Sequence, residues 1–293
     1  MPQYPASQTQ GEYNMKLLIV DGMNLLFQMF FGMPARIMGK GGKSIQGTLG
    51  FVGALIKIIK MTEPTHAVIL FDGEHENPRN DLLSEYKANR IDYTDVPDEE
   101  NPFSQLADVY AALDCMGISH CESIDNEADD VIASYALTYS ETMEIIIASF
   151  DSDFFQLINE NVNILRYRGD KTAFCDEEFI QEKFGIKPSE YADFKALIGD
   201  KADNIKGAEK VGPKTAAQLL KQFGNLGNII EKAGEIEKPS IRASIMASAE
   251  RLKVNYSLIK LECTAPMPFN LEDLQYTYNN MTTTEILRKI GVK

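Results

Sequence analysis

The sequence predicts an α/β fold, in which helices flank a mainly parallel central sheet and a helical region follows. Three short apolar runs, 16–20, 67–71 and 144–148, alternate with stretches of helical periodicity. Such alternation is typical of parallel sheets, because crossover helices cover both faces. An aspartate follows each run, so the three strands should release carboxylates at one edge of the sheet.

The composition is that of an ordinary globular chain of 293 residues, 44% hydrophobic and 25% charged. The 29 basic and 43 acidic residues give a formal net charge of −14, which by itself argues against a nucleic-acid partner. Four scattered cysteines and three histidines give no zinc-binding spacing and favour a reduced, cytoplasmic setting. The sequence has no apolar run of membrane-spanning length, so we expect no membrane partner.

The remaining elements follow in order along the chain. Residues 1–14 are polar and patternless, which predicts a disordered extension or a cloning remnant. A helix is expected over 48–61, where apolar residues recur at helical spacing. A second helix is expected from Asn101 to just before Gly117, because asparagine caps helices and glycine ends them. Residues 162–175 have the pattern of a β-hairpin.

The stretch 124–130 predicts the start of a further helix with three acids in its first turn, Glu127, Asp129 and Asp130. A single acid there is explained by the helix dipole, and Asn126 is the candidate cap. Three acids in four residues exceed that need, and their repulsion requires a cation. A divalent metal with oxygen ligands, such as Mg²⁺, would supply it.

More aspartates are expected at the same edge. Asp21 and Asp72 each end a strand in an Asp-Gly pair, which alone is often only a turn. Asp151 and Asp153 follow the third strand. The coincidence of these exits with the acidic helix start favours one shared metal centre at the carboxyl edge of the sheet.

The glycine-rich stretch 196–224 predicts a hairpin that binds phosphate. Asp200 and Asp203 are three residues apart and could face one direction. The helix that opens at Pro213 offers free amides to a phosphate, and Lys214 adds charge. Helix-hairpin-helix modules hold a duplex backbone in this way without reading bases. The alternative is an ordinary helical corner with solvated lysines.

The net charge has a different meaning if the candidate metal ligands are set aside. Nine fewer acids leave 29 basic residues against 34 acidic ones, a balance of −5. That balance is compatible with a basic DNA-binding face and predicts steep salt sensitivity. The nine candidates are Asp21, Asp72, Glu127, Asp129, Asp130, Asp151, Asp153, Asp200 and Asp203.

Together these motifs resemble the bacterial and phage 5′-nucleases of the flap endonuclease superfamily, including the N-terminal domain of many family-A DNA polymerases. The motifs stand in family order over about residues 15–265, as in a free-standing member. They are Val20-Asp21-Gly22, Phe71-Asp72-Gly73, Arg79, Glu85-Tyr86-Lys87-Ala88-Asn89-Arg90, Asn126-Glu127-Ala128-Asp129-Asp130, Asp151-Ser152-Asp153, Gly199-Asp200, Asp203-Asn204 and Val211-Gly212-Pro213-Lys214-Thr215-Ala216.

The resemblance implies a PIN-like nuclease domain over 15–185, a helical arch at about 74–104, and a helical DNA-binding region over 186–293 with a helix-three-turn-helix. It also implies two Mg²⁺ ions, for which Mn²⁺ can substitute. The first group of ligands would be Asp21, Asp72, Glu127, Asp129 and Asp130, of which Asp21, Asp72 and Asp130 are also assigned to catalysis. The second group would be Asp151, Asp153, Asp200 and Asp203.

The resemblance further implies that Lys87 and Arg90 approach the scissile phosphate and that Tyr86 lies near the terminal base. The expected DNA contacts are Arg79, Tyr86, Lys87, Arg90, Lys206, Gly207, Lys210, Gly212, Lys214 and Thr215. A K⁺ ion would be held by the carbonyl groups of Leu197, Ile198, Lys206, Ala208 and Val211.

The expected activity is structure-specific hydrolysis of DNA at 5′ ends, flaps, nicks and junctions, leaving a 5′-phosphate and a 3′-hydroxyl. Two metal ions would lower the pKa of a water and stabilise the leaving oxygen, so no histidine base is needed. We expect a bacterial or phage protein that is a monomer and acts in DNA replication or repair. Its expected location is the cytoplasm, in association with the nucleoid. A catalytically silent DNA-junction binder and a phosphatase with an aspartyl nucleophile are the alternatives.

Overall fold

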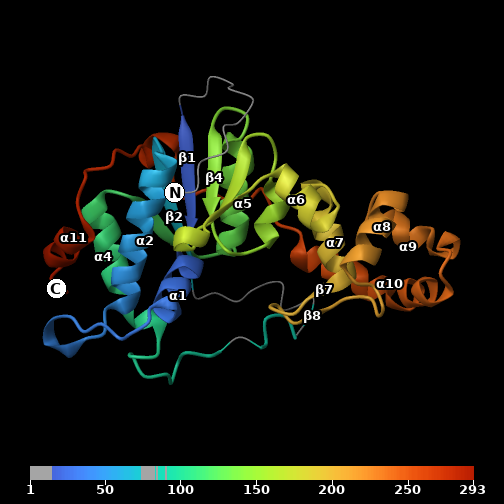
Figure 1. Ribbon diagram of the computed structural model, residues 1–293, viewed down its shortest axis with the longest axis horizontal. Coiled ribbons are helices and arrows are strands. Elements are labelled where there is room, and N and C mark those ends of the chain that lie inside the picture. Colours follow the sequence, from blue (N-terminus) through green and yellow to red (C-terminus); the bar gives the residue numbers. More distant parts are fainter. Residues whose placement is uncertain (1–14, 74–82, 84, 90) are drawn as a thin grey trace.

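The computed structural model describes residues 15–73, 83, 85–89 and 91–293 and has a six-stranded sheet at its centre (Figure 1). The strand order is β3-β2-β1-β4-β5-β6, and only β6 runs antiparallel to its neighbour. The mainly parallel sheet is therefore confirmed. The strands are β1 (Lys16–Asp21), β2 (His66–Asp72), β3 (Ser119–Ser123), β4 (Glu144–Ala148), β5 (Val162–Arg166) and β6 (Ala173–Cys175).

Alternate residues of β1 face two separate cores. Leu18 and Val20 pack with α1 (Gly22–Gly32), α2 (Gln46–Thr62) and α4 (Leu106–Met116). Leu17 and Ile19 pack on the opposite face with α5 (Ala128–Tyr139) and residues of the helical region. Because both faces are covered, the central strands are apolar throughout, which made them recognisable as short continuous runs.

Most predicted elements appear with small changes at their ends. The helix expected over 48–61 lies inside α2, and the hairpin expected over 162–175 is formed by β5 and β6. The helix expected from Asn101 starts with a 3₁₀ turn, in which the Asn101 side chain accepts a hydrogen bond from the Phe103 amide. It continues as α4 and ends at Gly117, whose φ of 71° is readily adopted by glycine.

The helical region starts with α6 (Glu177–Phe184) and α7 (Tyr191–Ile198). A two-stranded hairpin of β7 (Gly199–Asp200) and β8 (Ile205–Lys206) follows. Then come α8 (Pro213–Phe223), α9 (Leu226–Glu231) and α10 (Pro239–Ile259), at the opposite end of the molecule from α4 (Figure 1).

The last helix, α11 (Thr283–Lys289), returns to pack against α2 and α4. The end of the predicted helical DNA-binding region thus lies beside the nuclease domain (Figure 1). The proposed division between residues 185 and 186 stays a prediction. Short 3₁₀ turns complete the fold, namely η1 (Lys40–Gly42), η2 (Pro102–Gln105), η3 (Asp153–Leu157), η4 (Gly169–Lys171), η5 (Pro188–Glu190), η6 (Ala233–Glu235) and η7 (Leu271–Leu274).

Some predictions fall outside the described residues. These are the disordered extension over 1–14, the arch residues 74–82, and the DNA-contacting residues Arg79 and Arg90. Within the part of the chain that is described, no helix is both long and apolar enough to cross a membrane.

Candidate active site

Asp21 is held at the carboxyl edge of the sheet by two neighbours. It ends β1 and caps α1, accepting a hydrogen bond from the Asn24 amide at 3.0 Å. Its second oxygen accepts a hydrogen bond from the Ser149 hydroxyl at 2.8 Å. Burial, together with the negative charges of Asp72 and Asp151, raises the pKa of Asp21 to about 7.

The two Asp-Gly pairs are sites of close packing. A Cβ atom at Gly22 would lie 2.4 Å from the Phe71 ring, and one at Gly73 would lie 2.3 Å from the Ser123 carbonyl oxygen. Glycine is therefore needed after both Asp21 and Asp72 for the neighbouring elements to pack this closely.

The N-terminus of α5 meets the end of β2. The Asp72 carboxylate accepts a hydrogen bond from the Ala128 amide at 2.9 Å and so satisfies one of the free amides of the helix. The expectation that Asn126 caps this helix is wrong, because Glu127 occupies the cap position. Burial and the charges of Asp151, Asp72 and Asp21 raise the pKa of Asp129 well above its usual value of 3.8.

Asp130 is directed elsewhere. One turn of helix cannot place adjacent residues on one face, and Asp130 accepts a hydrogen bond from the Glu262 amide at 2.9 Å. Its carboxylate therefore contacts the segment that follows α10. The roles of Asp130 in metal binding and catalysis stay predictions.

A second acidic group forms where η3 meets the β7–β8 hairpin. Oxygen atoms of Asp153, Asp200 and Asp203 lie within 4.8 Å of one another. The Lys195 ammonium contacts both Asp153 and Asp200, and the lysine side chain is 7% exposed. Lys195 was not among the residues predicted for the site. The missed signal is its place in the apolar stretch Phe194-Lys195-Ala196-Leu197, which predicts a buried lysine.

The ionisable side chains of this second group have pKa values that are shifted in different directions. Burial raises the pKa of Asp153 to about 7, although Lys195 acts in the opposite direction. Burial also favours the neutral form of Asp200, but the Lys195 ammonium together with hydrogen bonds from backbone amides lowers the pKa of Asp200. Burial alone would lower the pKa of Lys195, whereas its two carboxylate partners raise it above the usual range. Lys195 and Asp200 thus form the ion pair.

Asp151 connects the two acidic groups. Its negative charge helps to raise the pKa of Asp129 in the first group and that of Asp153 in the second. It also accepts a hydrogen bond from the Asp153 amide at 2.8 Å. Buried carboxylates that repel one another are stabilised by a divalent cation, and oxygen donors suit Mg²⁺ or Mn²⁺. The donor chemistry of both groups therefore fits such ions.

Residues 85–89, here called the arch foot, lie against the acidic edge. The Lys87 ammonium pairs with Glu127 at 2.7 Å. The Tyr86 ring is only 5% exposed and belongs to the main core, with the Lys87 ammonium 4.9 Å from its centroid. A contact between Tyr86 and a terminal base would require the arch foot to shift, and it stays a prediction.

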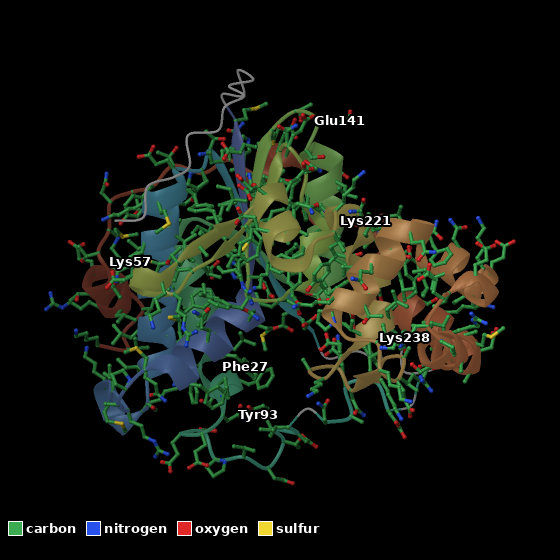
Figure 2. All side chains as sticks on the ribbon, turned by 45° about the vertical axis from the view of Figure 1, so that its right-hand side comes forward. Phe27, Lys57, Tyr93, Glu141, Lys221 and Lys238 are labelled. Atoms are coloured by element: carbon green, nitrogen blue, oxygen red, sulfur yellow. The ribbon has the colours of Figure 1, made fainter. Side chains whose placement is uncertain are left out.

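Residues 91–104, at the other end of the predicted arch, are anchored by aromatic rings. Tyr93 packs edge-on against Phe27 of α1, with ring centroids 5.6 Å apart (Figure 2). Phe103 completes the cluster at 5.5 Å from Phe27. Arg36 also pairs with both Glu99 and Glu100 at 3.2 Å. The acidic segment 91–104 is therefore held against α1 and the loop that follows α1.

The predicted phosphate-binding hairpin, residues 196–224, presents its phosphate-binding atoms to solvent. Gly212 is the cap residue of α8, and Pro213 is its first residue. The side chains of Lys206, Lys210 and Lys214 are exposed, whereas Gly207 and Thr215 are half-buried.

Three of the carbonyl groups proposed for K⁺ already accept hydrogen bonds. Those of Leu197 and Ala208 bond to the amides of Ala208 and Val211, and that of Lys206 bonds to the Asn255 side chain. The K⁺ site, which would also use Ile198, stays a prediction.

Comparisons with known proteins agree with this geometry. Residues 16–185 match the 5′-3′ exonuclease N-terminal resolvase-like domain, and residues 186–282 match the 5′-3′ exonuclease C-terminal SAM fold. The chain belongs to the 5′-3′ exonuclease family. This match confirms the resemblance.

Two curated relatives in this 5′-3′ exonuclease family match nearly end to end. The 5′-3′ exonuclease of Aquifex aeolicus is 33% identical over 261 residues, which cover 88% of this chain and 86% of that protein. The 5′-3′ exonuclease of Bacillus subtilis is 30% identical over 286 residues, which cover 96% and 94%. The thermostable DNA polymerase I of Thermus thermophilus is 30% identical over 257 residues, 87% of this chain, and the match spans only 30% of that polymerase.

Solved structures share the fold. The bacteriophage T5 5′-exonuclease with bound zinc has a TM-score of 0.70 at 23% identity, covering 94% of this chain and 99% of that chain. The catalytic core of Rad2 in complex with DNA substrate has a TM-score of 0.57 at 17% identity, covering 94% and 93%. The predicted 5′-nuclease fold, a mainly parallel sheet with a C-terminal helical region, is therefore confirmed.

Proposed function

We propose that this exonuclease hydrolyses DNA phosphodiesters at 5′ ends, flaps, nicks and junctions, and leaves a 5′-phosphate and a 3′-hydroxyl. The observation that supports this most is the pair of adjacent acidic groups joined through Asp151. The names of the matched relatives support a 5′-3′ exonuclease, and a T5 flap endonuclease structure of 22% identity is a complex with DNA and metal ions.

Two divalent ions, Mg²⁺ or Mn²⁺, would be held by the two acidic groups. Asp21, Asp72, Glu127 and Asp129 would provide the first site, with Asp130 behind them, and Asp151, Asp153, Asp200 and Asp203 the second. Such ions activate a water at neutral pH and stabilise the departing oxygen of an in-line displacement. The chain supplies the first site from rigid elements, because β1, β2 and α5 carry its residues.

The basic residues would act on the phosphates. Lys87 is held 2.7 Å from Glu127 and only partly exposed, so its ammonium can stabilise charge on the reacting phosphoryl group at the rim of the acidic edge. Arg90 would assist it. Gly212, Lys214 and the free amides of α8 would hold a duplex phosphate farther away.

The proposed mechanism uses no histidine as an acid or base. His66 begins β2 and therefore lies at the edge of the sheet opposite to the carboxylates. The ring of His120 stacks on Tyr110. We further propose that the enzyme acts as a monomer in the cytoplasm, in replication or repair of DNA, with K⁺ at the hairpin.

A 5′-end-labelled flap duplex and the same strand in a blunt duplex test the proposal. With Mg²⁺, we expect the flap to be cleaved near the junction and the products to carry a 5′-phosphate and a 3′-hydroxyl. Excess chelator should abolish cleavage. Robust cleavage in chelator, or a product with a 3′-phosphate, would contradict the proposal.

A further inference from the structure

The arch foot is joined to the loop that carries the second acidic group. The two segments are far apart in the sequence, and the hydrogen bonds that join them use backbone carbonyl groups as acceptors. The bonds are Lys87 amide to Asp203 (3.1 Å), Asn204 side chain to Glu85 (2.9 Å), and Asn89 side chain to both Lys201 and Ala202 (3.2 Å each).

The backbone conformation on both sides of this contact is unusual. Lys87 has a φ of 55° and Asn204 has a φ of 60°. Residues other than glycine adopt this left-handed conformation at a cost, although asparagine tolerates it better than most. Because two such residues face each other across hydrogen bonds, the contact itself holds both segments in these conformations.

Among the described residues, the exposed positions of the two segments add no buried contact on this side. Glu85, Ala88, Asn89, Lys201 and Ala202 are all exposed, so buried apolar surface does not join the two segments. On the opposite side, Tyr86 is buried in the main core. The arch foot is thus anchored by the Tyr86 ring and the Lys87–Glu127 pair, and oriented by the Lys87 amide and two asparagine amides.

We propose that Asn89 and Asn204 are positioning residues that couple the arch foot to the second acidic group. This inference rests on the proposed function, in which Lys87 acts on the reacting phosphate. Through the two amides, the Lys87 ammonium and the Asp203 carboxylate are presented as one unit. Displacing either segment would therefore misplace both the lysine and the second acidic group, without removing any charge from the site.

Asn204→Gly is the sharpest perturbation. Glycine accepts the φ of 60°, so the variant removes the side-chain bond to Glu85 without straining the backbone. Asn89→Ala removes the bonds from the other side. We expect Asn204→Gly to slow single-turnover cleavage of a saturating flap substrate in Mg²⁺ about fivefold, as the loss of one neutral hydrogen bond implies, and Asn89→Ala to slow it at least as much. Flap affinity measured in Ca²⁺ should stay within about twofold.

Asn228→Ala is the matched control. It removes a similar bond, from the Asn228 side chain to the Phe223 carbonyl at 2.8 Å, within the helical region. Its cleavage rate should equal that of the wild type. An equal loss in the control and in Asn204→Gly would mean that any lost amide bond slows the enzyme, and would overturn the proposal.

A double-mutant cycle identifies the group through which Asn204 acts. In a Lys87→Ala background, Asn204→Gly should slow cleavage by clearly less than about fivefold, because the lysine it positions is gone and only the second acidic group is still displaced. A full fivefold further loss would show that Asn204 acts independently of Lys87 and would overturn the coupling.

Hydrogen exchange provides a readout independent of activity. The Lys87 amide donates to Asp203, so a peptide spanning residues 85–89 should exchange faster in Asn204→Gly and Asn89→Ala than in the wild type. Unchanged exchange in both variants would refute the contact. If the wild type cleaves no DNA, the proposed function fails, whereas the exchange experiment still decides whether the two segments are coupled.

Discussion

Neutralising Asp21 should stabilise the metal-free enzyme at neutral and alkaline pH. Burial, Asp72 and Asp151 raise the pKa of Asp21 from 3.8 to about 7, so the folded state binds a proton that the unfolded state releases. This contribution to stability is complete below pH 3.8 and is lost as the pH rises through about 7. The full loss is about 4 kcal/mol, of which about 3 kcal/mol falls between pH 5 and pH 8.

The assay is urea unfolding in excess chelator at pH 5 and at pH 8. Asp21→Asn keeps the shape of the side chain and its hydrogen bond from Asn24, but it cannot ionise. The free energy of unfolding of the wild type should therefore fall by about 3 kcal/mol more than that of the variant between the two pH values. Asp170→Asn, which removes an exposed carboxylate from the β5–β6 hairpin, is the control and should follow the wild type. If Asp21→Asn also follows the wild type, the charge of Asp21 is not destabilised by its surroundings and the reasoning fails.

Four further predictions concern the charged residues. Asp153→Asn should lose cleavage by orders of magnitude and still bind a flap in Ca²⁺, because removing a negative charge cannot weaken attraction to phosphate; equal loss of binding would indicate a structural role. Lys195→Met leaves the buried carboxylates Asp153 and Asp200 without their ammonium, so the free energy of unfolding in chelator should fall by about 3 kcal/mol and recover in part with Mg²⁺; an unchanged value would contradict the pairing. Lys214→Ala should make the log–log salt slope of binding shallower by about one. Lys87→Ala should instead lower turnover much more than affinity. If both lysine variants change turnover and affinity in the same way, at least one of the two lysines does not contact the phosphate assigned to it.

Much of the fold could be predicted because its central strands are buried on both faces. Those strands read as apolar runs, and their aspartate exits identified the edge that carries the site. The edge strand β3 was missed because its sequence, Ser-His-Cys-Glu-Ser, has no apolar run and only one of its five residues is buried. An edge strand with one neighbour is specified by its pairing with β2, which local sequence does not reveal.

The individual roles of the acids depended on contacts distant in the sequence. Asp130 stands beside Asp129, yet it bonds to the Glu262 amide 132 residues away. Lys195 was not assigned to the site because its partners come from two other elements, η3 and the β7–β8 hairpin. A sequence motif groups residues by spacing, whereas helix rotation and tertiary packing decide which of them face one another.

The central claim is that two separate groups of carboxylates each hold a divalent ion. Titration calorimetry with Mn²⁺ on the wild type, Asp21→Asn and Asp200→Asn tests it most directly. We predict two bound ions in the wild type and one in each variant, with the ion that Asp200→Asn retains bound by the group around Asp21. A single ion in the wild type, or two ions still bound by Asp200→Asn, would contradict the account.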